Sequence, residues 1–122
     1  MSLLDRLIGR VAARLRSRRG RVLGGVGADG LLVTDEAGER RYRWDEVERV
    51  VAASSAGWIG ETIFLAIALA GEDTLVVSET NAHWSALVDA IATRLPGAEP
   101  PAEWQLRLLA TPDHPLGIYQ RR

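Results

Sequence analysis

The stretch Ile63-Phe64-Leu65-Ala66-Ile67-Ala68-Leu69 decides the fold, because it is wholly apolar and its two alternating sets of side chains differ in size. In a β-strand, successive side chains point to opposite faces of the sheet. One face therefore carries only leucines and isoleucines, and the other carries Phe64 and two alanines. We expect the first face to line the core. The alanine face favours close approach by the N-terminal helix, another sheet layer or a second subunit.

Short β-prone runs lie on both sides of this strand and are separated by turn signals. The turn signals are residues 27–30, 35–38 and 70–73, which combine glycine with aspartate or alanine. The runs predict strands over residues 21–26, 31–35, 39–44, 47–54, 62–69 and 74–78. Because turns of this kind join neighbouring strands as hairpins, we expect a strongly bent antiparallel sheet.

A helix follows the last predicted strand, over residues 81–95. Its apolar stripe consists of Trp84, Leu87, Val88, Ile91 and Leu95. Thr80 or Asn81 is the expected cap, and Pro96-Gly97 ends the helix. A proline-rich linker over residues 96–101 then leads to a strand-like tail that ends at Gln120. This pattern predicts an α+β fold with one C-terminal packing helix.

Residues 2–19 have the spacing of an amphipathic helix. The apolar positions are Leu3, Leu4, Leu7, Ile8, Val11 and Leu15. Residues 1–21 contain seven arginines and one acid, whereas residues 22–120 contain six arginines and fifteen acids. We expect two parts, a basic helix over residues 1–20 and one α+β domain over 21–122. The stripe either packs on the sheet or lies on an anionic membrane surface, with the arginines at the headgroups.

Composition excludes several classes of protein. The chain has 122 residues, of which 47% are hydrophobic and 25% charged, and its net charge is −1. These values are typical of a globular domain rather than a disordered or fibrous one. The absence of cysteine excludes thiol catalysis and thiolate metal sites. No apolar run is long enough to span a bilayer, and arginines interrupt any signal-peptide core. We therefore expect a cytoplasmic protein, with a location at the inner membrane if the helix is an anchor.

Residues that could carry chemistry are few and scattered. Glu79 and His83 would share one face of a helix, but Glu79 falls at a strand end. The carboxylates of Asp45, Glu46 and Glu48 are typical of a charged strand edge, and His114 lies between prolines in a turn. We predict no catalytic residue, no metal site and no cofactor. The acidic body also disfavours nucleic acid as a partner.

The order of elements resembles the pleckstrin-homology-like domains of small bacterial proteins. A tryptophan closes one strand, Trp44-Asp45-Glu46-Val47-Glu48-Arg49-Val50 enters the next, and a hairpin ends before a helix. The stretch from Glu79 to Tyr119 is also similar to bacterial proteins of this size with unknown function. The resemblance implies a barrel or sandwich that binds peptides, proteins or surfaces. Headgroup binding is not implied, because the first turn, residues 27–30, has no base.

We therefore expect a non-catalytic binding or adaptor protein that contacts a protein partner or an anionic membrane surface. The predicted contact residues lie on the N-terminal helix and on a glycine-flanked loop; they are Leu3, Leu7, Arg10, Arg14, Arg18, Arg19 and Trp58. Two alternatives stay open. One is a structural homodimer formed through the N-terminal helix or the face of Ala66 and Ala68. The other is a small hydrolase that uses Glu79 with His83, or the carboxylates near Asp45.

Overall fold

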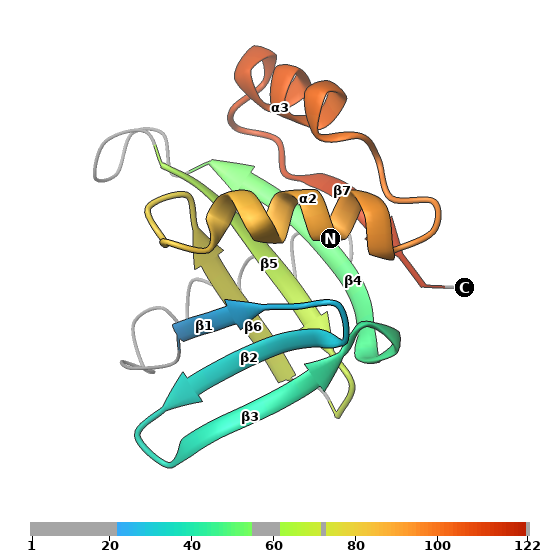
Figure 1. Ribbon diagram of the computed structural model, residues 1–122. Helices are drawn as coiled ribbons and strands as arrows, with labels where there is room; N and C mark the ends of the chain where they lie inside the picture. The colour runs from blue at the N-terminus through green and yellow to red at the C-terminus, as the bar shows by residue number, and fades with distance from the viewer. Residues whose placement is uncertain (1–21, 55–61, 72, 122) are drawn as a thin grey trace.

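The structure is a computed structural model that describes residues 22–54, 62–71 and 73–121. It contains two antiparallel sheets (Figure 1). The first has the order β1 (Val22–Val26), β2 (Gly30–Asp35), β3 (Gly38–Arg43). The second has the order β6 (Asp73–Ser78), β5 (Ile63–Leu69), β4 (Val47–Ser54), β7 (Leu116–Gln120). The predicted N-terminal helix and the loop around Trp58 lie outside the described residues.

All six predicted strands are present, and their ends differ from the prediction by one residue at most. The expected single bent sheet is instead divided in two at the 3-10 turn η1 (Trp44–Glu46). This turn separates β3 from β4, so that β4 pairs with β5 and β7 rather than with β3. The charged edge predicted between two strands at Asp45, Glu46 and Glu48 is therefore found only in part. The first two residues are in η1, and Glu48 is in a strand with neighbours on both sides.

The helix after β6 is α2 (Trp84–Arg94), which begins three residues later than predicted. Asn81 Oδ1 accepts a hydrogen bond from the backbone N–H of His83 at 2.8 Å, which forms a turn before the helix. His83 is the N-cap residue and makes no side-chain capping bond. The prediction that Thr80 or Asn81 caps the helix is therefore wrong. The predicted stripe is confirmed, since Leu87, Val88, Ile91 and Leu95 are buried and Trp84 is partly buried.

The tail after α2 differs from the prediction, because it contains a second helix, α3 (Pro101–Ala110). Pro101 occupies the first turn, where proline is favoured because its missing N–H would have no helical partner. Trp104 and Leu108 are four residues apart, so they share one face, and both are 1% exposed. The strand-like end of the tail is confirmed as β7, which pairs with β4.

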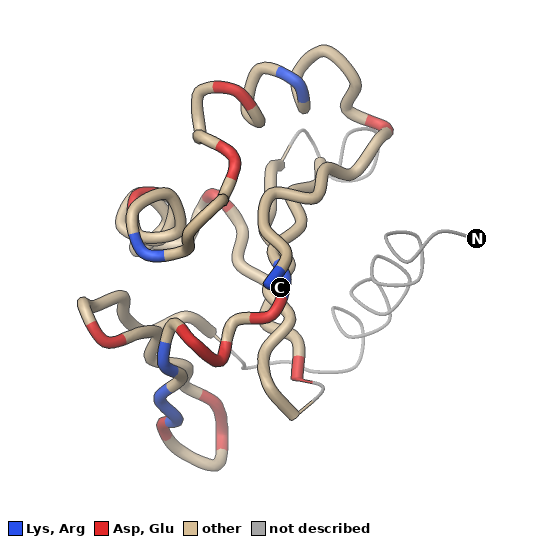
Figure 2. The backbone as a smooth tube through the Cα atoms, turned by 90° about the vertical axis from the view of Figure 1, so that its right-hand side faces the viewer, with Lys and Arg blue, Asp and Glu red and all other residues tan. Residues whose placement is uncertain are grey.

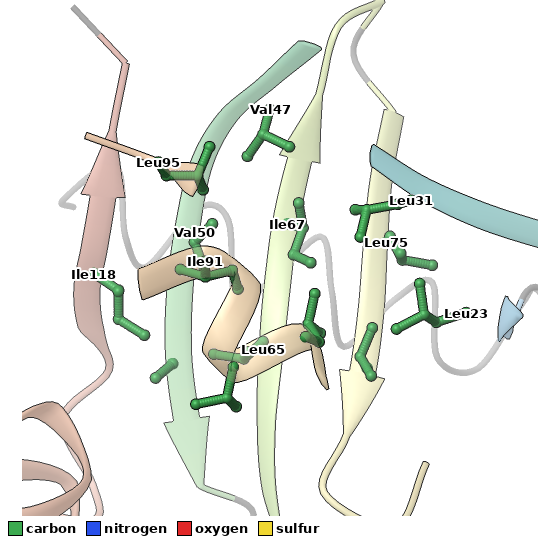
Figure 3. Close-up of a cluster of buried hydrophobic side chains, with 14 of the residues drawn as sticks. Leu23, Leu31, Val47, Val50, Leu65, Ile67, Leu75, Ile91, Leu95 and Ile118 are labelled. Atoms are coloured by element: carbon green, nitrogen blue, oxygen red, sulfur yellow. The ribbon is translucent and has the colours of Figure 1, made fainter. Parts of the chain in front are cut away.

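The core lies between the two sheets and α2 (Figure 3). The three-stranded sheet contributes Leu23, Leu31, Val33 and Tyr42; the four-stranded sheet contributes Val47, Val50, Ala52, Leu65, Ile67, Leu69, Leu75, Val77, Leu116 and Ile118. The helices complete it with Leu87, Val88, Ile91, Leu95, Trp104 and Leu108. The expectation that the leucines and isoleucines of β5 face the core is confirmed. Burial of this apolar surface is the main force that holds the sheets together.

Candidate binding surface

The contact residues predicted from the sequence all lie outside the described part of the chain. They are Leu3, Leu7, Arg10, Arg14, Arg18, Arg19 and Trp58. Their roles stay predictions. A candidate site must therefore be built from the residues that the structure describes.

The predicted pair Glu79 and His83 has structural roles in the turn between β6 and α2. The Glu79 carboxylate accepts a hydrogen bond from the N–H of Ile63 at 3.0 Å and so fastens this turn to the start of β5. His83 lies in the next turn, just before α2 begins, so the two residues do not share a helix face. Within the described ranges, no three His, Asp or Glu residues are grouped closely enough to hold a metal ion.

The carboxylates near β4 also stabilise the chain locally. Glu46 Oε2 accepts a hydrogen bond from the N–H of Arg43 at 3.1 Å, and Asp45 lies 3.2 Å from Arg43 Nε. His114 is exposed in the turn after α3, as expected. None of these contacts places an acid beside a base in a pocket, which general acid–base catalysis requires. Among the described residues, no observation favours the hydrolase alternative.

A hollow of about 350 Å³ lies beside the β1–β2 hairpin. Its lining includes Gly25, Gly27, Gly30 and Leu32, together with Arg41 and Arg43 of β3. Glycines leave space where side chains would otherwise fill the surface. Leu32 lies between Gly25 and Arg41 in the strand register, and its side chain is only half-buried. The hollow thus offers an apolar patch with a guanidinium group next to it.

The hairpin turn combines backbone N–H groups that are unused within the described ranges with the exposed carboxylate of Asp29, and both belong to residues that line the hollow. Three of its four carbonyl oxygens, those of Gly27, Asp29 and Gly30, are used within the protein: Gly27 O accepts from Trp44 Nε1 at 3.0 Å, and Asp29 O accepts from the Trp44 N–H at 3.3 Å. Gly30 O accepts from the Gly27 N–H at 2.9 Å. By contrast, no described residue accepts from the N–H of Ala28 or Asp29. An acceptor on a ligand can therefore bind here without displacing an internal bond.

The three arginines of β3 differ in their partners. Arg40 lies over the Tyr42 ring, 4.6 Å from its centroid, and 3.6 Å from Asp73. Arg43 is paired with Asp45. Arg41 is exposed, and it makes no ion pair or hydrogen bond within the described ranges. Of the three guanidinium groups, Arg41 is thus the one most available to a ligand.

Tyr42 links the arginine strand to the four-stranded sheet. Its hydroxyl donates to Asp73 Oδ2 at 2.8 Å, and its ring is 1% exposed. We predict that Tyr42→Phe lowers the free energy of unfolding by about 1–2 kcal/mol, because a hydrogen bond to a charged carboxylate is lost. Urea denaturation measures this change. Tyr119→Phe is the matched control, since no described residue bonds its hydroxyl; equal effects of the two substitutions would contradict the prediction.

Comparison with known proteins adds no family to this geometry. No family model matches the chain, and no curated protein or solved structure matches it. Across the described ranges, no helix has the length and apolar character needed to cross a membrane.

Sequence reasoning did not identify the hollow, although its signals are present in the sequence. The β1–β2 region contains four glycines within seven residues, and β3 contains three arginines within four. The alternation in Arg41-Tyr42-Arg43-Trp44 does predict arginines on a solvated face. It does not predict that this strand lies beside the glycine-rich hairpin, because the pairing of β2 with β3 sets that proximity.

Proposed function

We propose that this chain is a non-catalytic binding module that holds a short acidic segment of a partner protein. The observation that carries the proposal is the guanidinium of Arg41, which has no ion pair or hydrogen bond with any described residue and lies beside a glycine-lined hollow. Arginine forms two parallel hydrogen bonds with a carboxylate, and it is enriched among residues that dominate protein interfaces. The half-buried Leu32 next to it suits an apolar side chain of the same segment.

Charge favours a short segment over an extended anionic surface. The described ranges contain seven arginines and thirteen acidic residues, so their net charge is −6. At the hollow this charge opposes a membrane of anionic lipid or a nucleic-acid backbone, both of which present many negative charges at once, although residues 1–21 bring the net charge of the whole chain to −1. A peptide with one carboxylate between apolar residues needs only to place that carboxylate at Arg41 and an apolar side chain at Leu32.

We also propose that the fold is pleckstrin-homology-like. Two antiparallel sheets covered by a helix after the last hairpin support this assignment. The arrangement departs from that family in three ways: within the described ranges six strands rather than seven precede α2, and α3 and β7 follow it. Members that bind phosphoinositides use bases in the first hairpin, whereas here the available base comes from β3. The departure is consistent with a peptide ligand.

Selection of displayed random dodecapeptides tests the proposed function. We expect the full chain to enrich sequences in which an acidic residue has apolar neighbours, and a labelled peptide of this kind to bind measurably. Arg41→Gln should lower the affinity for that peptide about tenfold or more, because charge-assisted hydrogen bonds contribute roughly 1.5–3 kcal/mol to the free energy of binding. Fluorescence anisotropy measures the affinity at two salt concentrations. The difference between the two values shows how strongly salt screens the interaction of the peptide with Arg41.

Arg94→Gln is the matched control, because Arg94 is an exposed arginine on α2, outside the lining of the hollow. An equal loss in both variants would indicate a general charge effect and contradict the role of Arg41.

Arginines on an edge strand also prevent edge-to-edge pairing of sheets. If no acidic preference emerges, Arg41 has only that protective role. Co-sedimentation with phosphatidylglycerol vesicles, but no peptide binding, would favour a membrane partner instead.

A further inference from the structure

The side of the four-stranded sheet that faces away from α2 carries small apolar side chains in its central row, with Phe64 and Ser78 in one neighbouring row and Arg49 and Thr74 in the other. Val51 of β4 pairs with Ala66 of β5, which pairs with Val76 of β6, so these residues form a row across the sheet. Ala53 and Ala68 lie on the same side, one in each neighbouring row. We call these five residues the outer face.

The centre of the outer face is buried. Val51 is 0% exposed, Ala66 is 1% exposed and Ala53 is 5% exposed, although none of them belongs to the core cluster. The strand partners of Val51 are Ala66 and Gly117, which are too small to cover its methyl groups. Figure 2 places α2 and the three-stranded sheet on the other side of this sheet. The remaining described helix, α3, contacts β4 and β7 but buries its Trp104 and Leu108 in the core cluster, so the complete burial of Val51 points to a layer contributed from outside the described ranges.

The length of the remaining segments selects the one that can form this layer. Four strands about 4.8 Å apart span about 15 Å from the first to the last. Residues 55–61 connect the ends of β4 and β5, and only single residues remain at positions 72 and 122. Residues 2–19, as a helix, extend about 27 Å. The exposure of their apolar stripe to water is also unfavourable, so this stripe must be buried against another surface.

The chain enters the described structure at the edge of this sheet. β1 begins at Val22 and contacts β6, the edge strand. Asn81 Nδ2 donates to Leu23 O at 3.3 Å, which fixes the start of β1 near the end of β6. The preceding residues can thus pass around this edge and reach the outer face without a long linker.

We infer that residues 2–19 form a helix that packs across the outer face, with Leu7, Val11 and Leu15 against the row of Val51, Ala66 and Val76. The alanines permit a close approach of the helix backbone. Residues 1–21 carry a net charge of +6 and the described ranges carry −6, so their attraction favours the docked arrangement. In the free protein the stripe is then part of a second core rather than a membrane anchor, and the arginines form the outer surface.

Thiol accessibility in the full chain tests this inference, because the protein has no cysteine of its own. Ala66→Cys places a thiol on the outer face, and Ala92→Cys places one at an exposed position on α2. We expect the thiol at position 66 to react with a chromogenic disulfide reagent roughly 100-fold more slowly than that at position 92, since it reacts only during opening. Similar rates would overturn the inference.

A second substitution identifies the covering segment. Val11→Asp, combined with Ala66→Cys, should raise the reaction rate at position 66 at least tenfold, because a carboxylate cannot be buried on the apolar face. Ala13→Asp is the matched control, since position 13 is on the opposite side of the predicted helix. Ala52→Cys, a buried position facing the core from β4, should stay protected in the Val11→Asp background. If Val11→Asp does not fold, Val11→Thr gives a smaller change in the same direction.

Two results would assign the outer face or the stripe differently. Protection at position 66 that weakens on dilution would indicate that a second copy of the chain covers the face, as in the homodimer alternative; sedimentation would then show a dimer. Rapid reaction at position 66, together with binding of the full chain to anionic vesicles, would assign the stripe to a membrane surface. Either result overturns intramolecular docking.

Discussion

Gly30→Ala is expected to destabilise the protein by about 3 kcal/mol, a large part of the stability of a domain of this size. Gly30 has a φ of 156°, a conformation that residues with a side chain rarely adopt. A Cβ atom at this position would overlap the carbonyl oxygen of Tyr42 and lie 2.8 Å from the Cα of Arg43. Both neighbours are backbone atoms of β3, the strand that pairs with Gly30, so the overlap is relieved only by disrupting that pairing.

Urea denaturation followed by circular dichroism measures this loss as a lower midpoint with an unchanged slope. Gly27→Ala is the control in the same hairpin, because a Cβ atom added there would meet nothing within 4 Å and the φ of Gly27 is not in the left-handed region. We expect that substitution to change stability by less than about 0.5 kcal/mol. A small effect at both positions would mean that the β2–β3 pairing can shift to admit a side chain, contrary to the geometry described above.

The strands could be predicted from the sequence because two local signals agree. Alternation of large and small residues sets which face of β5 is buried, and glycine-containing turns separate the runs on either side. The division into two sheets could not be predicted in this way. It depends on η1, which follows β3 directly and in which Glu46 accepts the N–H of Arg43. That bond is a three-dimensional contact, which a propensity for strands does not reveal.

The second helix was missed because its apolar pattern is ambiguous. Trp104, Leu106 and Leu108 alternate as in a strand, whereas Trp104 and Leu108 alone have helical spacing. The structure resolves the ambiguity, since Leu106 is 68% exposed while the other two are buried. Pro101 at the first helical turn was the available signal. The candidate site was missed for a different reason, because strand pairing brings Arg41 to the hairpin.

Trp104→Ala is expected to lower the free energy of unfolding by about 3–5 kcal/mol, the range for removal of a large aromatic side chain from a core. Trp104 is 1% exposed and is the largest of the fully buried side chains. Its helix, α3, contacts α2, β4 and β7, so the indole lies where the tail meets the four-stranded sheet. Leu106→Ala, on the exposed side of α3, should change stability by less than about 0.5 kcal/mol.

The shape of the unfolding transition in Trp104→Ala tests the prediction that residues 21–122 form one domain. If the tail and the sheets unfold together, the variant shows one transition with a lower midpoint, whether it is followed by circular dichroism or by tryptophan fluorescence. A separate early transition, with fast amide exchange confined to α3 and β7, would contradict that prediction. The single transition is expected because β7 pairs with β4, which is a central strand of the sheet, so release of the tail exposes the backbone of β4 and the core residues Leu116 and Ile118.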